Sequence, residues 1–473
     1  MALQVFNTLS GRKEPFETLE PGVVKMYVCG VTVYASAHVG HAMSYLVFDT
    51  IRRYLEHLGY TVRHVQNFTD VDDKIIARAH AEGVSAYEIA DRYAREFTIE
   101  IDRLGLLPAH IYPRVSSEMP SIVAMIEQLV AGGHAYAAAN GDVYFDVGRF
   151  PGYGRLSRRN LDEARPAEAE VPGKHTPHDF ALWKAAKPGE PAWASPWGPG
   201  RPGWHIECSA MARAHLGDAI DLHGGGEDLK FPHHENEIAQ SEACCATAFS
   251  RFWVHNGLVQ VGDEKMSKSL GNIVSIRDFL SAHEPEALRL FVQMGHYRNP
   301  TTLTDDAIEA AEKGLARLRG ALRPARGPDG AAPAAPSPAA QALAAAVDGT
   351  RAAFTTAMDD DFGTPGAVAA LFDLVTEINR AREAGVHADA LAAAQRALVE
   401  LAGILGYDLP RGFAAASKGG AGEAKPFVDV LVALRDEARA ARDWALADRL
   451  RDALAERGVT IEDGPGGSTW RLG

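Results

Sequence analysis

The chain has 473 residues, of which 46% are hydrophobic and 23% charged, a balance typical of globular proteins. At about 150 residues per domain, this length predicts about three domains. No apolar run approaches the ~18 residues needed to span a membrane, and residues 1–13 contain no apolar signal segment, so we expect a cytoplasmic protein without membrane contact.

The net charge and the cysteine content narrow the possible classes of protein further. The net charge of −14 is unusual for a nucleic-acid binder, because phosphate contacts need local positive charge. Local positive charge does occur in residues 149–159, which contain arginines but no acidic residue. The few cysteines exclude a disulfide framework and fit a reducing compartment, where cysteines bind metal, react or lie in the core; they are Cys29, Cys208, Cys244 and Cys245.

The first hundred residues predict an α/β unit. Residues 23–33 are rich in β-branched side chains and predict a buried strand, residues 40–58 have helical periodicity, and residues 60–68 predict a second strand. A strand, a helix and a second strand in this order form one βαβ unit of a parallel sheet.

A short histidine motif follows the first predicted strand. His38 and His41 flank Gly40 at the expected start of the helix. A helix N-terminus offers backbone N–H groups and a positive dipole end to an anion, and both imidazoles can donate to phosphate oxygens. We therefore predict a phosphate-binding turn; the alternative is a pair of ordinary polar loop residues.

A second phosphate motif lies far downstream, where residues 265–269 read Lys-Met-Ser-Lys-Ser. Lys265 and Lys268 would neutralise charge that grows on a triphosphate as its α-phosphorus is attacked. A solvated basic turn is the alternative reading.

Candidate metal ligands form a third group. His233 and Glu237 are separated by one helical turn and share a helix face, a spacing that suits two ligands of one metal. Cys29 and Cys208 would complete a zinc site with two sulfurs, one nitrogen and one oxygen. His234 is an open alternative to His233, and buried structural cysteines are the alternative to ligands.

These motifs resemble a known family. The two phosphate motifs resemble the HIGH and KMSKS signatures of the class I aminoacyl-tRNA synthetases, in the same order on an α/β scaffold. Residues 26–34, 203–209 and 223–237 resemble, more narrowly, the cysteinyl-tRNA synthetases, and this resemblance covers nearly the whole chain. After His41 the family often has Ala-Arg, whereas Met43 stands here in place of the arginine.

The resemblance implies an activity and its participants. It implies that L-cysteine is activated with ATP to cysteinyl-adenylate and transferred to the 3′ end of tRNA(Cys), with one Zn²⁺ per chain, Mg²⁺ accompanying ATP, and a monomeric enzyme. It also implies zinc ligands Cys29, Cys208, His233 and Glu237, and catalytic residues His38, His41, Lys265 and Lys268. The residues implied for ATP or adenylate binding are His38, Gly40, His41, His223, Gly224, Gly225, Gly226, Asp228 and Lys268. Those implied for the cysteine pocket are Gly30, Thr69 and Trp204.

Zinc has a physical reason to be present in such a pocket. Serine differs from cysteine only by oxygen for sulfur, and a hydrophobic pocket discriminates such near-isosteres poorly. Zinc binds a thiolate well, whereas an alcohol is a poor ligand with a high pKa. A substrate thiolate that joins the zinc ligands would give selectivity without a separate editing site.

With the resemblance, the predicted fold is α/β: a class I Rossmann-like catalytic domain with an insertion, then a helical bundle and a small α+β C-terminal domain. Ala/Pro/Gly-rich stretches predict the linkers. The predicted order is the first catalytic half at 1–119, a connective insertion at 120–202, the second half with the KMSKS loop at 203–275, a helical stem-contact region at 276–324, a linker at 325–338, the bundle at 339–410, a linker at 411–424, and an anticodon-binding domain at 425–473.

Two other functions share part of this pattern. A mycothiol-pathway cysteine ligase, which joins cysteine to glucosaminyl-inositol, would have the same zinc and ATP motifs, but a ligase for a small sugar has no use for residues 425–473. A non-catalytic paralogue that only binds RNA is disfavoured by the intact histidines and lysines of both phosphate motifs.

Overall fold

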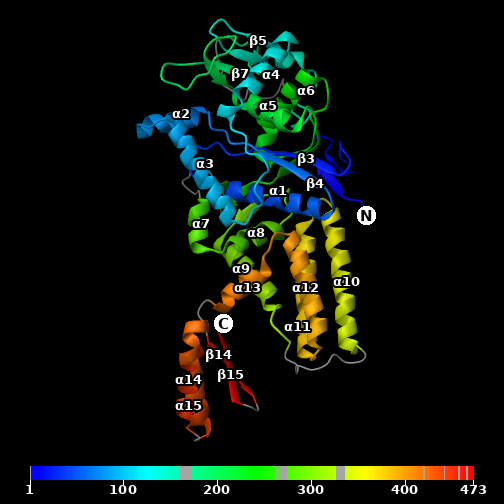
Figure 1. Ribbon diagram of the computed structural model, residues 1–473, viewed down its shortest axis with the longest axis vertical. Coiled ribbons are helices and arrows are strands. Elements are labelled where there is room, and N and C mark those ends of the chain that lie inside the picture. Colours follow the sequence, from blue (N-terminus) through cyan, green and yellow to red (C-terminus); the bar gives the residue numbers. More distant parts are fainter. Residues whose placement is uncertain are drawn as a thin grey trace. The chain divides into compact units, whose positions relative to one another are not determined.

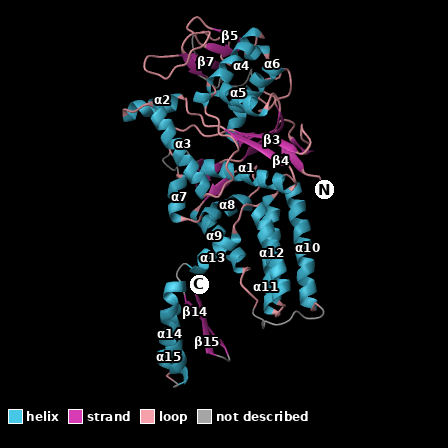
Figure 2. Cartoon of the chain, in the orientation of Figure 1, coloured by secondary structure: helices cyan, strands magenta, loops and turns pink. Residues whose placement is uncertain are grey.

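The computed structural model describes residues 2–159, 173–261, 264–265, 274–325, 336–418, 421–440, 443–455, 459–464 and 467–472. The chain divides into two compact units, which contain residues 1–318 with 324–407, and residues 319–323 with 408–473. Figure 1 labels the elements and Figure 2 distinguishes helices from strands. Among the described residues, no helix is both long enough and apolar enough to cross a membrane.

A four-stranded parallel sheet with the order β10-β9-β3-β4 lies in the first unit. Its strands are β3 (Val23–Val28), β4 (Thr61–Gln66), β9 (Ile220–Gly226) and β10 (Ser250–Asn256). Most of their side chains are buried, as expected for a parallel sheet with helices on both faces. Two halves of the sheet that are distant in sequence thus pair directly, and the predicted α/β fold is confirmed.

Helices cover both faces of this sheet. Figure 1 shows α1 and α8 on one side and α5 and α6 on the other. The helices around the sheet are α1 (Val39–His57), α2 (Asp73–Glu82), α3 (Ala86–Arg103), α5 (Trp204–Leu216), α6 (Glu235–Cys245), α7 (Ile276–Ala282) and α8 (Pro285–Met294). The α1 helix has a continuous buried face and follows β3 directly, which gives the βαβ unit predicted from the sequence.

The first strand is shorter than predicted. It ends at Val28 rather than at Val33, because the N–H of Gly30 donates to the Asn67 side chain instead of continuing a ladder. Beyond that point Thr32 forms only an isolated bridge with Thr69. The chain therefore leaves the sheet just where the candidate site residues begin.

The insertion consists of one helix and a small antiparallel sheet with the order β5-β6-β7-β8. Its elements are η1 (Val115–Ser117), α4 (Met119–Ala131), β5 (Ala135–Ala137), β6 (Val143–Phe145), η2 (Val147–Arg149), β7 (Phe180–Ala185) and β8 (Gly200–Pro202). Phe145 and Trp183 from this sheet share one hydrophobic core with Cys29 and Cys208. The insertion is thus packed against the candidate metal ligands.

Smaller elements border the parallel sheet. A hairpin joins β1 and β2, and a three-stranded sheet has the order β12-β11-β13. These elements and the two short helices before α6 are β1 (Gln4–Asn7), β2 (Arg12–Pro15), η3 (Glu227–Leu229), η4 (Lys230–His234), β11 (Val259–Val261), β12 (Glu264–Lys265) and β13 (Thr301–Leu303). Helix α9 (Asp305–Gly320) follows β13 in the chain.

A bundle of three helices completes the first unit: α10 (Pro338–Asp359), α11 (Thr364–Glu383) and α12 (Ala388–Ile404). Asp361, in the turn between α10 and α11, fixes the bundle to the rest of the unit. Its buried carboxylate accepts hydrogen bonds from the Phe6 backbone N–H (2.8 Å), the Tyr297 hydroxyl (2.8 Å) and Arg298 Nε (2.7 Å). The linker predicted at 325–338 lies mostly outside the described residues.

The second unit has helices α13 (Leu409–Lys418), α14 (Ala421–Ala440) and α15 (Trp444–Ala455), and an antiparallel hairpin of β14 (Val459–Gly464) and β15 (Gly467–Leu472). Val428, Val432, Leu454 and Val459 form its core. The α13 helix occupies part of the stretch predicted as a linker at 411–424, because its alanines favour a helix.

Candidate active site

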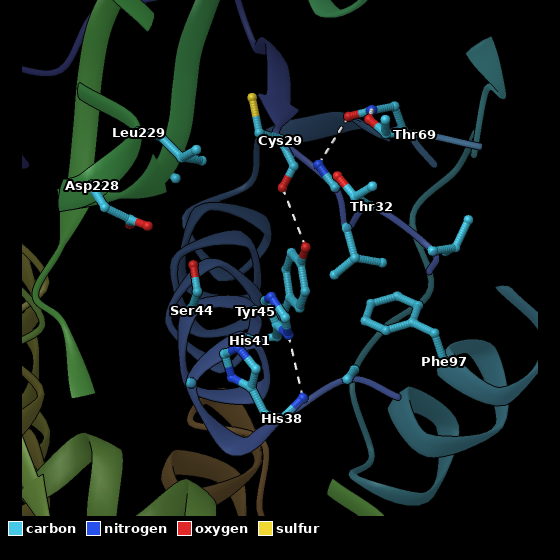
Figure 3. Close-up of a pocket in the computed structure, with 18 of the residues that line it drawn as sticks. Cys29, Thr32, His38, His41, Ser44, Tyr45, Thr69, Phe97, Asp228 and Leu229 are labelled. Atoms are coloured by element: carbon cyan, nitrogen blue, oxygen red, sulfur yellow. Dashed lines mark hydrogen bonds between the residues drawn. The ribbon is translucent and has the colours of Figure 1, made fainter. Parts of the chain in front are cut away.

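A cavity of about 370 Å³ opens at the carboxyl ends of β3 and β9, where parallel α/β sheets usually bind their ligands. Figure 3 shows Cys29, Thr69, Asp228 and both motif histidines around it. The lining also includes Gly30, Gly40, Trp204, Cys208, Gly225, Gly226 and His233. Most of the residues predicted from the sequence therefore meet in one cavity.

The histidine motif forms the first turn of α1. His38 is the residue before the helix, and its backbone N–H donates to Nδ1 of His41 at 3.3 Å (Figure 3). The two rings stack with centroids 3.7 Å apart. A Cβ on Gly40 would lie 3.0 Å from Nδ1 of His38, so glycine keeps the turn compact. The result is a helix N-terminus, flanked by two imidazoles, that faces the cavity and can receive a phosphate.

The lysine motif is only partly described. Lys265 lies in β12, paired with Gln260, whereas Lys268 lies outside the described residues. The described chain resumes at Val274, whose carbonyl accepts the N–H of Val39 beside the histidine turn. Val274, five residues after the motif, is thus hydrogen-bonded to the start of α1.

The four predicted metal ligands converge at the base of the cavity. They come from the end of β3 (Cys29), α5 (Cys208), η4 (His233) and α6 (Glu237), and their ligand atoms all lie within 4.8 Å of one another. The Sγ atoms of the two cysteines are 3.8 Å apart, Cys29 Sγ is 3.4 Å from Glu237 Oε1, and His233 Nε2 is 3.1 Å from the same oxygen. All four are buried, which leaves an acidic, sulfur-rich cluster that fits a zinc ion.

A second histidine lies close enough to compete for the metal. His234 Nε2 is 3.3 Å from Cys29 Sγ, its Nδ1 is 2.8 Å from His255 Nε2, and His255 Nδ1 is 2.9 Å from the Thr8 hydroxyl. A set with His234 in place of His233 is compact too, but it replaces the thiol of Cys208 with His223. Because thiolates favour zinc, the set with both cysteines is the stronger candidate.

The electrostatics of the cluster favour one thiolate. A hydrogen bond from Cys29 lowers the pKa of the Cys208 thiol to about 6, against the effect of burial. Burial and the neighbouring Cys208 raise the pKa of Cys29 well above its usual value. Burial alone would lower the pKa of His233, but Glu237 and Cys208 raise it to about 10. The buried cluster therefore favours a thiolate on Cys208 beside a protonated His233, and a bound cation would change which of these groups hold protons.

Asn67, just after the end of β4, also lines the cavity, and no sequence motif indicated it. Asn67 is buried; its Oδ1 accepts the N–H of Gly30 at 2.9 Å, and its Nδ2 donates to the Thr69 hydroxyl at 3.2 Å. Thr69 in turn donates to Glu207 at 3.2 Å. Only its place two residues before Thr69 at a strand end could have pointed to Asn67.

His223 and Gly224, both predicted to bind the adenylate, are not among the residues that line the cavity. His223 is buried with Nε2 2.8 Å from Glu237 Oε2, and its ring stacks on Trp253. A Cβ on Gly224 would lie 2.2 Å from the Phe48 ring, so this glycine serves helix packing. Gly225, Gly226 and Asp228 do line the cavity.

Known proteins match the chain along its length. A family model described as the tRNA synthetases class I (C) catalytic domain matches residues 15–313, the DALR domain matches 353–409, and the cysteinyl-tRNA ligase anticodon binding domain matches 422–471. A curated cysteine–tRNA ligase from Alkalilimnicola ehrlichii is 52% identical over 99% of both chains, and one from Halorhodospira halophila is 50% identical over 99% of both. The chain belongs to the cysteine–tRNA ligase family.

Solved structures agree on the fold of this cysteine–tRNA ligase family member. Mycobacterium tuberculosis methionyl-tRNA synthetase bound by methionyl-adenylate has a TM-score of 0.58 at 16% identity, over 81% of this chain and 90% of that one. Agrobacterium radiobacter K84 LeuRS, in a complex with tRNA and LeuAMS, has a TM-score of 0.61 at 11% identity, over 86% of both chains. The class I synthetase fold predicted from the sequence is therefore confirmed.

One departure from the cysteine–tRNA ligase pattern has a structural explanation. Met43, where the resemblance leads one to expect arginine, is 5% exposed and packs inside α1's buried face. An apolar side chain suits this environment, and the histidine turn before it is intact.

Proposed function

We propose that this protein is a cysteine–tRNA ligase: it activates L-cysteine with ATP and transfers the cysteinyl group to the 3′ end of tRNA(Cys). The observation that carries the proposal is the buried cluster of Cys29, Cys208, His233 and Glu237 at the base of a cavity whose mouth carries the His38–His41 turn. One end of the cavity suits a thiol and the other suits a phosphate.

The first step is adenylate formation. A carboxylate oxygen of cysteine attacks the α-phosphorus of ATP, a new P–O bond forms, and pyrophosphate leaves with the electrons of the broken bond. In this proposal, His38 and His41 donate to the phosphate oxygens, the N-terminus of α1 stabilises their charge, and Lys265 and Lys268 meet the charge that grows on the leaving group. Mg²⁺ would accompany ATP and share this charge.

Substrate selection depends on the base of the cavity. A Zn²⁺ ion held by Cys29, Cys208, His233 and Glu237 would supply a Lewis acid that prefers the substrate thiolate to a serine hydroxyl. Trp204 stacks on His233, with ring centroids 4.4 Å apart, and lines the same cavity. Thr69 and Gly30, which Asn67 holds by hydrogen bonds, also line the cavity and would contact the bound amino acid.

In the second step, a hydroxyl of the terminal ribose of tRNA attacks the cysteinyl carbonyl and AMP leaves. We propose that residues 425–473 bind the anticodon end of the tRNA and that residues 276–324 contact its acceptor stem. The bundle at 339–410 would support the tRNA between them. The proposal includes action as a monomer in the cytoplasm. The match of residues 422–471 to an anticodon binding domain speaks against the mycothiol-pathway ligase.

The experiment for this proposal is amino-acid-dependent exchange of pyrophosphate into ATP by the purified protein. Cysteine should support exchange, while serine at equal concentration should support less than about a hundredth of that rate, because an alcohol is a poor zinc ligand. Equal exchange with both amino acids would contradict the assignment of the cluster to thiol selection.

A further inference from the structure

Two of the four cysteines lie outside the metal cluster and are adjacent in the chain. Cys244 and Cys245, the thiol pair, are the last two residues of α6, and both are half-buried. Residues 246–248, which follow them, are exposed, so solvent reaches this end of the helix. The proposed reaction gives the thiol pair no role.

Polar groups from outside α6 surround the thiol pair. The Cys244 thiol donates to Gln128 Oε1 of α4 at 3.0 Å, and the Cys245 thiol donates to Asp218 Oδ1, just after α5, at 3.4 Å. Arg213 of α5 donates to both acceptors, each at 2.7 Å, and its Nη1 is also 3.4 Å from the Cys244 sulfur. Both thiols therefore lie against one network centred on Arg213, although adjacent residues of a helix usually point apart.

A disulfide is an unfavourable state for the thiol pair. The Cα atoms of adjacent residues are about 3.8 Å apart across a trans peptide bond, whereas disulfides usually join Cα atoms at least about 4.4 Å apart. Burial raises the pKa of both thiols, that of Cys245 to about 12, although Arg213 opposes the shift. Both sulfurs therefore keep their protons near neutral pH, and oxidation, which proceeds through the thiolate, is disfavoured.

Trivalent arsenic reacts with two neighbouring thiols in a way that avoids both obstacles. Arsenous acid, As(OH)₃, condenses with two thiols: two As–S bonds form, two As–O bonds break, and each departing hydroxide leaves as water with one thiol proton. Arsenic stays trivalent, so the reaction needs no oxidant or reductant. The arsenic atom bridges the sulfurs, so the short S–S bond that adjacent residues accommodate poorly is not formed. The hydroxyl that remains on arsenic can donate to the carboxylate of Asp218, which already accepts from the Cys245 thiol.

We propose that Cys244 and Cys245 form a binding site for trivalent arsenic compounds, separate from the metal cluster. The second As–S bond forms within one chain, and such a linked contact strengthens binding greatly over a single thiol. The metal cluster also offers two sulfurs, those of Cys29 and Cys208, but both are fully buried and would be held by the zinc ion. The thiol pair is reached from solvent and has no competing metal ion in this account.

The test is the uptake of arsenite by the full-length, zinc-loaded protein, measured as arsenic and zinc per chain after free arsenite is removed. Wild type should take up about one arsenic per chain and keep its zinc. Cys244→Ser and Cys245→Ser each retain one thiol of the pair, so each should bind arsenite at least about a hundredfold more weakly, because the second As–S bond is lost. Native mass spectrometry of wild type should show one added As–OH group in place of two thiol hydrogens.

Ala248→Ser is the matched control, because it places the same side chain at an exposed position just beyond the thiol pair and removes no sulfur. It should take up arsenite as wild type does. Wild type that takes up no arsenic would overturn the proposal. Uptake that releases zinc, or equal uptake by both cysteine variants and wild type, would overturn it too, because the arsenic would then be bound by the metal cluster.

Discussion

At the scale of single residues, the metal cluster draws each donor from a different element. The end of β3, helix α5, the short η4 and helix α6 supply one ligand atom each, and none of the four is exposed. Because each element is held by its own core contacts, loss of one ligand should leave the other three in place. Single substitutions therefore test the chemistry of the cluster rather than the fold.

Replacing Cys208 by serine should remove the metal. A serine hydroxyl keeps nearly the same shape but does not ionise near neutral pH, so we expect the zinc content to fall from about one ion per chain to less than about 0.2. Elemental analysis of the purified proteins measures this. Cys245→Ser is the control, since Cys245 is half-buried outside the cluster, and it should retain its zinc. Full zinc in the Cys208 variant would refute the ligand assignment.

Loss of the Asn67 side chain should weaken the binding of cysteine but not the binding of ATP. Asn67→Ala removes the acceptor of the half-buried Gly30 N–H and the donor to the Thr69 hydroxyl, which keeps its hydrogen bond to Glu207; the unpaired N–H should cost about 1–3 kcal/mol. We expect the KM for cysteine in pyrophosphate exchange to rise about tenfold and that for ATP to change less than about twofold. Asn140→Ala, in an exposed turn of the insertion, is the control. A parallel rise of both KM values would show a general loss of structure instead.

At the scale of elements, α3 and α7 are joined by an unusual ion pair. Glu100 of α3 is 2% exposed, and both of its carboxylate oxygens lack a hydrogen bond among the described residues. Arg277 of α7 lies 2.7 Å from Glu96 and 3.9 Å from Glu100. Burial, with the charge of Glu96, raises the pKa of Glu100 to about 7, although Arg277 and Arg103 oppose the shift.

This contact predicts a pH dependence of stability. The folded protein holds a proton on Glu100 that the unfolded chain releases above pH ~4.5, so the contribution of Glu100 to the free energy of unfolding falls as the pH rises from about 4.5 to about 7. Glu100→Gln keeps the neutral shape, so the Tm of the variant minus that of wild type should grow between about pH 5 and pH 8. The exposed Glu88→Gln should show a constant difference. A constant difference for Glu100→Gln too would contradict this account.

Periodicity and motif spacing predict these elements unevenly. The βαβ unit follows from strong local patterns, whereas the prediction of the four metal ligands rests on the helical spacing of His233 and Glu237 and on the resemblance of their surroundings to the cysteinyl-tRNA synthetases. The end of β3 at Val28 could not be predicted in this way, because it depends on the side chain of Asn67, the residue just after β4. The family resemblance assigns His223 to the adenylate, yet its buried partner is Glu237, a contact set by the packing of α6 on the sheet.

At the scale of the whole molecule, the two compact units separate the catalytic cavity from the segment that we propose binds the anticodon. All described residues of the cavity and the metal cluster belong to the first unit. A chain that ends at Tyr407 should therefore keep cysteine-dependent pyrophosphate exchange within about twofold, because the first unit has its own core. Transfer to tRNA should fall at least about tenfold, mainly through KM for tRNA, since distant contacts position the acceptor end. Equal charging by both chains would remove the reason for assigning residues 425–473 to the anticodon.

The central claim is that the activated cysteine is destined for tRNA. The most direct measurement supplies the full-length protein with ATP and labelled cysteine, and offers tRNA(Cys) and glucosaminyl-inositol in parallel reactions. This account predicts an ester-linked cysteine on the tRNA, formed only with ATP, and none on the amino sugar. Labelled cysteine on glucosaminyl-inositol, with uncharged tRNA, would contradict it.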